Sequence, residues 1–468
     1  MTGAAFFDLD RTLLAGASGT VFASALKRAG LMGHRSIPGE RLLFGVYNAI
    51  GETLPSMLLA RQAGSLARGR SVAATIDAAR EAAVELAASL QPHAPRVFAQ
   101  HRAAGRLLVL ATTTPEDLVR PFAELLGFDD VVATRYRVVD GCYDGSLDGE
   151  FTWAGAKLRA VRAWSEAHGV SLDDSWAYSD SFYDRHLLGA VGHPVAVNPD
   201  PRLMALAVAR RWPILHLDLP PGVPKVFGLE PQRLVLGLTR LPLVFPYARF
   251  DIAGTEQIPS TGPAIVVANH RSYFDVPAIA TLMGRTGRTV RFLGKREMFD
   301  APIVGPVMRA MGGIAVDRGS GSDKPLEMAL EALLAGELVA LMPQGTIPRG
   351  QAFFDPVLRA RPGVSRLVTM ARKRGVEVPV IPVGLWGTEQ VWPRSSRLPD
   401  VLGIVDPPLV TVRVGAPIIL RTARHEANMT RIMNKISALL PPQAREARQP
   451  TPEELARTFP PGKGPDPS

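Results

Sequence analysis

The amino-acid sequence predicts an α/β protein in which each half of the chain carries its own largely parallel sheet. Short apolar runs alternate with longer segments of helical periodicity, as buried parallel strands and their covering helices do. The chain has 468 residues, too many for one core of ordinary size, and a Pro- and Gly-rich stretch at 219–224 separates two such patterns. We therefore predict two α/β domains, at 1–218 and 230–440, joined by a linker at 219–229.

The composition excludes several classes of protein. With 46% hydrophobic and 21% charged residues, the chain is neither disordered throughout nor fibrous, and a single cysteine, Cys142, excludes a disulfide framework or a cysteine-based zinc site. The net charge of +9 favours acidic partners: nucleic acid, an anionic membrane face, phosphorylated substrates or an acidic carrier protein. Because the arginines are dispersed and no recognition motif is present, we do not expect nucleic-acid binding.

The two ends of the chain give further expectations. The first residues lack the basic and long apolar regions of a signal peptide, and no uninterrupted apolar window reaches the roughly 18 residues of a transmembrane helix. We therefore expect a cytoplasmic protein that does not cross a bilayer. Residues 441–468 are rich in proline and charge, so we expect a disordered, Pro-rich tail there.

In the first domain, the expected strands lie at 4–7, 107–111, 176–178 and 194–197. Some ninety residues of helical sequence, roughly 15–100, separate the first two strands, far more than one crossover needs. We therefore expect a helical cap at this position.

Polar residues follow the first expected strand. Residues 8–12 read Asp-Leu-Asp-Arg-Thr, and the carboxylates of Asp8 and Asp10 can share a hard cation while one of them attacks phosphorus. The alternative for this pentapeptide alone is an Asp-rich turn. Thr112 follows the second strand, where a hydroxyl can hold a phosphate oxygen, and Lys157 opens a helical stretch, where it can supply a positive charge or remain solvated.

The third strand ends in residues 178–184, Tyr-Ser-Asp-Ser-Phe-Tyr-Asp. This segment adds Asp180 and Asp184, although Asp184 can instead cap the helix that follows. A metal, a lysine and a hydroxyl around a carboxylate are sufficient parts for phosphoryl transfer. The ordered set therefore predicts a phosphatase.

These ordered motifs resemble those of the haloacid dehalogenase-like hydrolases, in the phosphoserine-phosphatase-like branch with a helical cap. The resemblance covers nearly all of residues 1–218 and implies a Rossmann-like parallel sheet with a helical cap. It implies that Asp8 is the nucleophile and that Asp10 protonates the leaving alcohol and then activates water. It also implies that Mg²⁺ is held by Asp8, the carbonyl of Asp10 and Asp180 with Asp184 in support, and that phosphate is bound by Thr112 and Lys157.

Substrate choice in such a domain depends on the cap. A stripe of apolar residues at helical spacing runs through it: Leu43, Val46, Tyr47, Ile50 and Leu54. The stripe either packs against another cap helix or forms an apolar wall for a lipid chain.

In the second domain, the expected strands lie at 264–268, 289–293, 338–342 and 378–383. His270 leaves the first of these, and Asp275 follows in the first turn of a helix, so the carboxylate can fix the tautomer of a general base. Because Ser272 stands three residues before Asp275, a helix-capping role for this aspartate is an equal alternative on local sequence alone.

Four further blocks follow, at 294–299, 312–318, 343–346 and 378–382. Together with the His270 block they resemble the glycerolipid acyltransferases related to 1-acylglycerol-3-phosphate acyltransferase. The resemblance covers about 250–420. It implies that His270 deprotonates a glycerol hydroxyl, that Asp275 orients His270, and that the acceptor is bound by Lys295, Arg318, Gly345 and Thr346.

One block departs from the family pattern. Glu-Gly-Thr-Arg is typical, whereas this chain has Gln344-Gly345-Thr346-Ile347, followed by Arg349 after a proline. A neutral hydrogen bond is weaker than a charge-assisted one, so we expect Gln344 to alter acceptor contacts, with Arg349 supplying the missing guanidinium.

Together these motifs predict a bifunctional phospholipid-biosynthesis enzyme. The acyltransferase is expected to move an acyl group from acyl-CoA or acyl-carrier protein to a lysophospholipid, and the Mg²⁺-dependent phosphatase to act on phosphatidate or lysophosphatidate. In two alternatives, the first domain hydrolyses an unrelated soluble phosphomonoester or is a silent scaffold.

Residues 232–250 predict an interfacial helix divided by Pro242, with basic residues on one side and leucines on the other. We therefore expect peripheral contact with the inner face of the membrane, the alternative being that this stripe packs on the domain.

Overall fold

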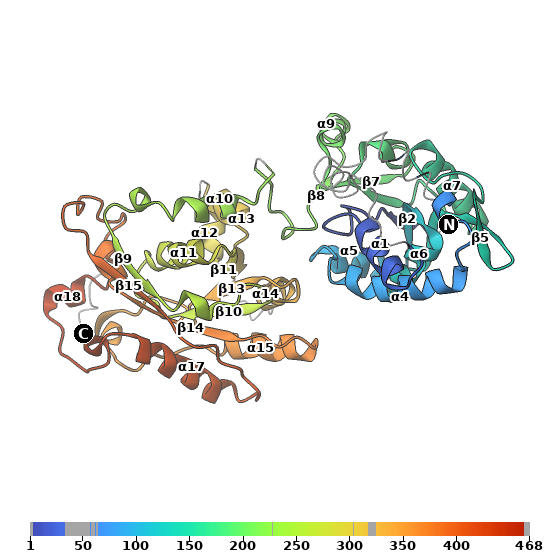
Figure 1. Cartoon of the computed structure of the whole chain (residues 1–468). Coiled ribbons are helices and arrows are strands. Elements are labelled where there is room, and N and C mark those ends of the chain that lie inside the picture. The colour runs from blue at the N-terminus through green and yellow to red at the C-terminus, as the bar shows by residue number, and fades with distance from the viewer. Residues whose placement is uncertain are drawn as a thin grey trace. The chain divides into compact units, whose positions relative to one another are not determined.

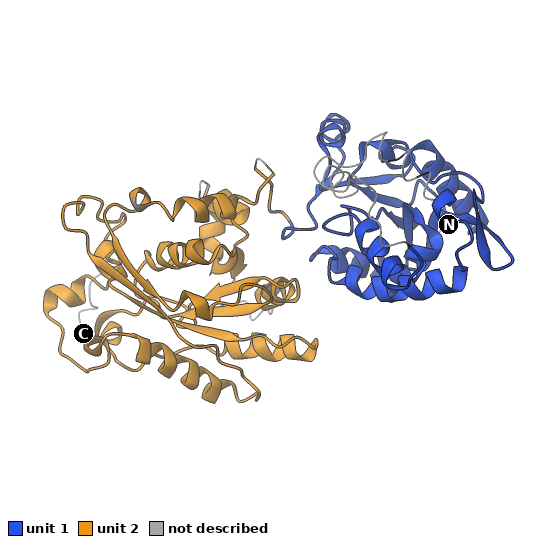
Figure 2. Cartoon of the chain, viewed as in Figure 1, with its two compact units in different colours: residues 1–221 blue, residues 222–468 orange. Residues whose placement is uncertain are grey.

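The protein is described here by a computed structural model, which covers residues 3–32, 57, 61, 64–226, 228–302, 304–316 and 324–462. The chain divides into two compact units, Met1–Pro221 and Gly222–Ser468 (Figure 2). The division falls inside the stretch that the sequence suggests as a linker. Each unit contains a sheet with helices packed against it, which confirms the predicted α/β class.

Unit 1 is built on a parallel sheet with the strand order β3-β2-β1-β6-β7-β8 (Figure 1). Its strands are β1 (Ala4–Phe7), β2 (Leu107–Pro115), β3 (Asp130–Thr134), β6 (Trp176–Ser179), β7 (His193–Val197) and β8 (Ile214–Leu215). All of β1 is buried, as its unbroken apolar sequence requires. The register pairs Phe7 with Leu110 of β2 and Tyr178 of β6, so the chain leaves these three strands at one edge.

Helices and a hairpin surround this sheet: α1 (Gly19–Arg28), α4 (Val72–Ala87), α5 (Ala94–Ala103), α6 (Glu116–Leu125), α7 (Gly155–Ala167), α8 (Arg185–Leu188), α9 (Pro201–Arg210), the 3₁₀ helix η1 (Phe182–Asp184) and the hairpin β4 (Tyr136–Val139) with β5 (Cys142–Leu147). The predicted cap range includes α5, yet α5 packs on the sheet, with the ring of Phe98 5.2 Å from that of Phe7. The apolar stripe at 43–54 lies outside the described residues.

Unit 2 has the strand order β12-β11-β13-β10-β14-β15-β9. Its strands are β9 (Arg249–Ala253), β10 (Ala264–Ala268), β11 (Val290–Lys295), β12 (Ile314–Val316), β13 (Leu338–Leu341), β14 (Val380–Trp386) and β15 (Leu409–Val414). The strands pair in parallel except where β14 meets β15. In β10, Val266 faces one apolar core and Val267 the other, so the strand is covered on both sides.

The helices of unit 2 are α10 (Pro231–Leu238), α11 (Asp275–Thr286), α12 (Arg296–Asp300), α13 (Val304–Ala310), α14 (Lys324–Leu334), α15 (Gly363–Lys373), α16 (Thr388–Val391), α17 (His425–Leu439) and α18 (Pro452–Ala456), with 3₁₀ turns η2 (Pro242–Val244), η3 (Thr255–Gln257), η4 (Gly350–Phe353) and η5 (Pro442–Ala444). We expected residues 232–250 to form one interfacial helix divided by Pro242. The structure instead has α10 followed by η2, and β9 begins at Arg249, within this segment. Among the described residues, no helix is long and apolar enough to cross a membrane.

The expectation of a disordered tail at 441–468 is wrong for residues 441–462. Thr451 and Glu454 form a reciprocal capping box at the start of α18, and the side chain of Thr458 is buried. The Thr458 hydroxyl accepts a 2.8 Å hydrogen bond from the backbone N–H of Gly350. These local and long-range contacts offset the entropy that the segment loses when it becomes ordered. The composition alone indicated that this loss would keep the segment disordered.

Candidate active sites

In unit 1, the candidate residues gather where β1, β2 and β6 end. The backbone N–H of Asp8 donates to the carbonyl of Tyr178 at 2.9 Å, which continues the β1–β6 pairing by one residue. Thr112 follows in β2 at the same edge, where its buried hydroxyl accepts from the N–H of Thr114. Asp180 comes directly after β6. Parallel strands therefore bring side chains from three distant segments to one place.

Lys157, in the first turn of α7, connects two of these carboxylates. Its Nζ atom donates to Oδ1 of Asp8 at 2.9 Å and to Oδ2 of Asp184 at 2.7 Å, and its side chain is only 1% exposed. A lysine buried this deeply needs such partners, because an unpaired ammonium loses its hydration. Ser179 also donates to Oδ2 of Asp184 at 2.8 Å. The lysine is therefore fixed beside the predicted nucleophile.

Thr12 joins Asp8 to Asp180. Its hydroxyl lies 3.2 Å from Oδ2 of Asp8 and 3.2 Å from Oδ1 of Asp180, and it accepts from the N–H of Asp180 at 3.0 Å. Arg11, which has a left-handed φ of +59°, places Nε 3.3 Å from Oδ2 of Asp180. A cationic group thus already faces the Asp180 carboxylate.

The two predicted catalytic aspartates are in unlike environments. Burial raises the pKa of Asp8 to about 6; the charge of Lys157 opposes this rise and that of Asp184 adds to it. Burial also raises the pKa of Asp10, against the 2.6 Å hydrogen bond that its carboxylate accepts from the N–H of Ser18. A raised pKa suits Asp10 to donate a proton to a leaving group.

The oxygen atoms at this edge suit a hard cation. Among the described residues, no three Asp, Glu, His or Cys side chains gather closely enough to hold a metal by themselves. Asp8 and Asp180 share Thr12, however, and Oδ1 of Asp184 is buried without a hydrogen-bond partner. The carboxylates of Asp10 and Asp184 are used by Ser18 and Lys157, so these two residues fit the backbone and supporting roles that the resemblance implies.

In unit 2, His270 and Asp275 form a hydrogen-bonded pair. His270 follows β10, Asp275 is the first residue of α11, and Nδ1 of the imidazole lies 2.7 Å from Oδ2 of the carboxylate. The same oxygen accepts from the N–H groups of Arg271 and Ser272, at 2.7 and 2.9 Å, and Oδ1 accepts from the hydroxyl of Thr388 at 2.6 Å. Asp275 therefore orients the histidine and also satisfies backbone donors of the turn before α11, whose N-cap residue, Phe274, makes no side-chain capping bond.

This arrangement defines the state of the imidazole. A carboxylate only accepts hydrogen bonds, so Nδ1 of His270 carries a proton and, in the neutral ring, Nε2 is left as the acceptor. The backbone of His270 is held as well, because its N–H donates to Oε1 of Gln344 at 2.6 Å. The pair can act as an oriented general base.

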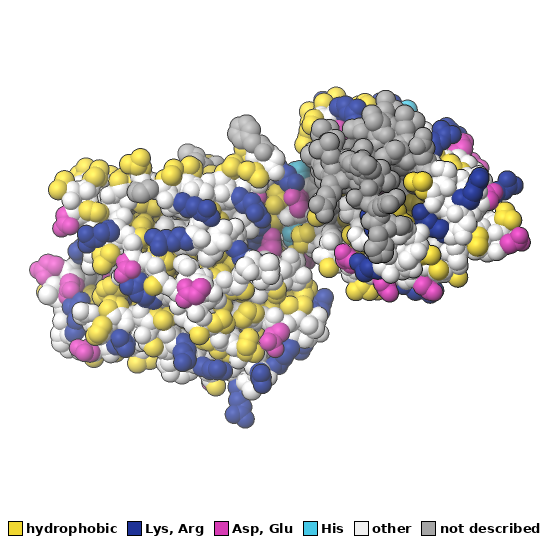
Figure 3. Space-filling view, viewed as in Figure 1, with side chains coloured by type: hydrophobic (Ala, Val, Ile, Leu, Met, Phe, Trp, Pro, Cys, Tyr) yellow, Lys and Arg dark blue, Asp and Glu magenta, His cyan; other side chains and the backbone are white. Residues whose placement is uncertain are grey.

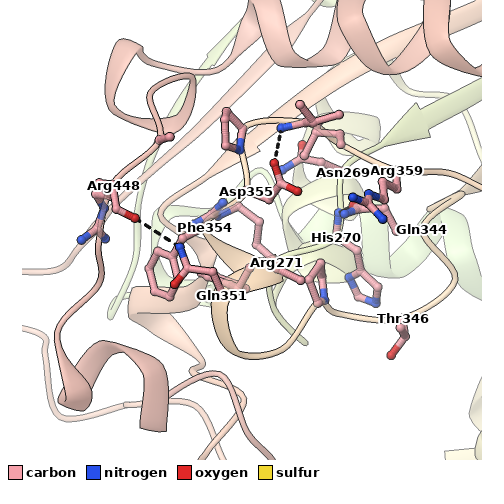
Figure 4. A pocket seen from close by; sticks show the side chains of 17 residues that line it. Asn269, His270, Arg271, Gln344, Thr346, Gln351, Phe354, Asp355, Arg359 and Arg448 are labelled. Atoms are coloured by element: carbon pink, nitrogen blue, oxygen red, sulfur yellow. Dashed lines mark hydrogen bonds between the residues drawn. The ribbon is translucent and has the colours of Figure 1, made fainter.

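A cavity of about 520 Å³ opens beside His270 (Figure 4). Its wall combines aromatic and aliphatic side chains with three arginines, and Figure 4 shows the imidazole on the side that also carries Gln344 and Thr346. The lining residues are Asn269, His270, Arg271, Gln344, Thr346, Pro348, the stretch 351–359, Ala447 and Arg448. An apolar cavity with a few polar groups is typical of a small-molecule site.

Some of the predicted acceptor-binding residues line the cavity and others do not. Gln344 and Thr346 line the cavity, and Gly345 between them adopts a φ of +74°, which favours glycine. Lys295 and Arg349 do not belong to the cavity wall as described, and Lys295 instead lies 3.0 Å from Glu297 on the surface. Arg318 lies outside the described residues.

Comparisons with known proteins match a family to each half of the chain. Residues 5–189 match the haloacid dehalogenase-like hydrolases. A Streptomyces azureus protein named inhibition of morphological differentiation protein is 36% identical over 220 residues, which are 46% of this chain and 79% of that protein. The chain belongs to the haloacid dehalogenase-like hydrolase family. A Mycobacterium tuberculosis phosphoserine phosphatase is 35% identical over 217 residues, 46% of this chain and 70% of that enzyme.

Beyond this hydrolase domain, residues 249–386 match the acyltransferase family. A chloroplastic 1-acyl-sn-glycerol-3-phosphate acyltransferase of Brassica napus is 29% identical over 178 residues, which are 37% of this chain and 46% of that protein. Unit 2 is an acyltransferase domain. The chain is therefore an enzyme that joins a haloacid dehalogenase-like hydrolase domain to a transferase domain.

Several site residues were missed from the sequence. In the hydrolase domain, Ser179 ends β6 directly before Asp180, and Thr12 lies two residues after Asp10; closeness to an assigned carboxylate is the signal that could have found them. In the acyltransferase domain, Thr388 and Arg448 reach their sites from distant segments, for which no local signal exists.

Proposed function

We propose that the acyltransferase domain acylates a lysophospholipid such as 1-acylglycerol 3-phosphate, with acyl-CoA or acyl-carrier protein as donor. The observation that carries the proposal is the 2.7 Å His270–Asp275 pair, whose histidine lines a largely apolar cavity. The Brassica napus relative, a 1-acyl-sn-glycerol-3-phosphate acyltransferase, supports this choice of acceptor. In this mechanism Nε2 of His270 takes the proton of the acceptor hydroxyl, whose oxygen attacks the thioester carbonyl. The carbon–sulfur bond then breaks, and the thiolate leaves with that proton.

The hydrolase domain is proposed to be a Mg²⁺-dependent phosphomonoesterase. Asp8, Asp180 and the carbonyl of Asp10 would hold Mg²⁺, which when bound neutralises charge on the phosphoryl oxygens. Asp8 attacks phosphorus to form an aspartyl-phosphate, while Asp10 gives its proton to the leaving alcohol. Asp10 then takes a proton from the water that cleaves the aspartyl-phosphate. Lys157 and Thr112 bind phosphate oxygens in this scheme, with Lys157 already beside Asp8.

The phosphatase substrate is proposed to be phosphatidate or lysophosphatidate, because the second domain makes or consumes these lipids. A soluble phosphomonoester is the second candidate, which the phosphoserine phosphatase relative favours. A silent scaffold is disfavoured, since Asp8, Lys157 and Asp184 are in direct contact.

The protein is further proposed to bind the inner face of the membrane from the cytoplasm without crossing it. Three leucines at the end of α10 and in the turn that follows are exposed, Leu238 by 55%, Leu241 by 54% and Leu243 by 85%. Figure 3 shows hydrophobic side chains along the edge of unit 2 that carries α10. Leu236 is buried in the core and holds the helix on the domain. Such an exposed apolar set suits the lipid interface at which these substrates lie.

The test uses purified protein given lysophosphatidate, acyl-CoA and Mg²⁺, with lipid products and free phosphate followed together. His270→Ala should remove acyl transfer, by about 10² to 10⁴ in rate, and leave phosphate release unchanged. Asp8→Asn should do the reverse. If either variant, still folded, loses both activities, the proposal of two separate sites is wrong.

A further inference from the structure

The C-terminal segment at 445–459 is built into the acyltransferase domain. At one end the carbonyl of Arg448 accepts a hydrogen bond from Nε2 of Gln351 at 3.3 Å (Figure 4). At the other end Thr458 accepts from the N–H of Gly350 at 2.8 Å, and the carbonyl of Arg457 accepts from the N–H of Ser395 at 3.3 Å. The segment is thus attached to the loop that follows Gln344 at two points.

This attachment places Arg448 on the cavity wall. Its guanidinium lies 4.8 Å from the centre of the Phe354 ring, and Phe354 itself lines the cavity. Both terminal nitrogens pair with the carboxylate of Glu454, at 2.7 and 2.8 Å. A bidentate pair and an aromatic face together fix the plane of the guanidinium while its side chain stays 45% exposed. Arg448 is therefore oriented and still accessible.

Guanidinium groups, two of them held by carboxylates, are the cationic groups of the described cavity wall. Arg271, Arg359 and Arg448 line the cavity, with Asp355 as the acidic residue among the described lining. Arg271 forms an ion pair with Glu389 at 2.8 Å, and its guanidinium carbon lies 4.4 Å from the centre of the Phe353 ring and 4.2 Å from that of Trp386. Where the family pattern has its arginine, this chain has Ile347, which is 3% exposed and carries no charge. The guanidinium groups that line the cavity therefore come from other segments.

We propose that the cavity binds the phosphorylated headgroup of the acyl acceptor, and that Arg448 is a specificity-determining residue for it, assisted by Arg359. The inference rests on the acyl transfer proposed above and names the side chains that select its acceptor. Figure 4 shows Arg359 on the side of the cavity with His270 and Arg448 on the opposite side. A headgroup that enters between them has a guanidinium group on either side, an arrangement that favours a phosphate ester.

The experiment measures equilibrium binding of short-chain 1-acylglycerol 3-phosphate to the full-length protein, without acyl donor. EDTA is present so that a metal-dependent phosphatase does not consume the probe. Arg448→Ala should raise Kd on the order of fivefold, as expected for one charge-assisted contact at a half-exposed site. The matched control is Arg445→Ala, an exposed arginine of the same segment outside the cavity wall, which should leave Kd unchanged. Monoacylglycerol, which has no phosphate, should bind all three proteins equally.

Two outcomes overturn the proposal. One is an equal Kd for the Arg448→Ala and Arg445→Ala proteins, and the other is an equal loss for the phosphorylated and neutral lipids. Arg448→Lys guards against a merely structural effect, because it keeps the charge and should keep most of the affinity. If the Arg448→Lys protein binds as weakly as the Arg448→Ala protein, the charge of residue 448 does not determine the affinity. Acyl transfer by the unmodified protein is measured separately. If the protein binds the lipid through Arg448 but does not transfer an acyl group, the result counts against the proposed function and not against this inference.

Discussion

The backbone N–H of His270 donates a 2.6 Å hydrogen bond to Oε1 of Gln344. The bond ties the segment after β10 to the segment after β13, which pairs with β10 in the sheet. A glutamate at this position could accept the same bond, so Gln344 preserves the support of His270 and removes a negative charge from the cavity wall. The departure from the family pattern therefore concerns the electrostatics of the cavity more than the position of the base.

Gln344→Glu should change the ranking of acyl acceptors more than the use of acyl donors. The carboxylate keeps the bond to His270 but adds a negative charge to the cavity wall, so the KM values of phosphorylated and neutral acceptors should change relative to one another by severalfold while kcat changes little. Steady-state kinetics with phosphorylated and neutral acceptors check this. Gln344→Leu is the control for lost support and should lower kcat. An unchanged acceptor profile with an altered donor profile would contradict the placement.

Lys157→Met should destabilise the hydrolase domain and abolish phosphate release. Removal of the buried ammonium leaves the carboxylates of Asp8 and Asp184 without their common partner, a loss of about 3 to 5 kcal/mol in the free energy of unfolding. Chemical denaturation of the hydrolase domain, monitored by hydrogen exchange of the backbone amides in β1, measures the loss.

The control for this change is Arg159→Ala on the same helix, whose exposed pair with Glu150 should contribute little. Addition of Asp184→Asn to Lys157→Met should recover part of the stability, because one of the two unpaired charges is removed. Equal stability of the Lys157→Met and Arg159→Ala proteins would show that the buried lysine does not hold these carboxylates.

Acidification should weaken the hydrolase domain through His101. The ring donates to or accepts from the hydroxyl of Tyr178 at 2.8 Å, and burial, with the charge of Arg106, lowers its pKa from 6.5 to about 4. Between these pH values the unfolded chain binds a proton that the folded chain does not. The free energy of unfolding should therefore decrease as the pH decreases, by at most about 1.4 kcal/mol per pH unit.

Denaturation of the hydrolase domain at pH 7 and pH 5 measures this slope. His101→Gln can still hydrogen-bond to Tyr178 but does not titrate in this range, so its slope should be smaller than that of the unmodified protein. Identical slopes would assign the acid sensitivity to other groups.

Strand ends explain how much of both sites could be predicted from sequence. Asp8, Asp180 and His270 each follow a short apolar run by one or two residues, so local pattern indicates both the strand and the position of the side chain. Thr388 is 113 residues from its partner Asp275, and Thr458 is 108 residues from Gly350. Contacts of that separation depend on the completed fold and leave no periodic signal. This is why the order of the C-terminal segment, and with it the place of Arg448, was not predictable.

Membrane contact through the end of α10 predicts that exposed leucines, rather than buried ones, control binding to vesicles. Replacement of Leu238, Leu241 and Leu243 together with glutamine should release the protein from anionic vesicles in a sedimentation assay. Because all three side chains are more than half exposed, circular dichroism and the unfolding midpoint should change little. Neighbouring basic residues assist on such vesicles by about 1 kcal/mol each, so added salt should also weaken binding.

The matched control replaces two leucines elsewhere on the same domain, Leu398 and Leu402, which are 71% and 87% exposed. Their replacement by glutamine removes comparable apolar surface but should leave vesicle binding intact, because lipid contact depends on where the apolar residues lie as well as on their exposure. Equal release of both proteins would point to nonspecific adsorption. Retained binding by the triple variant, with its fold intact, would exclude the end of α10 as the membrane contact.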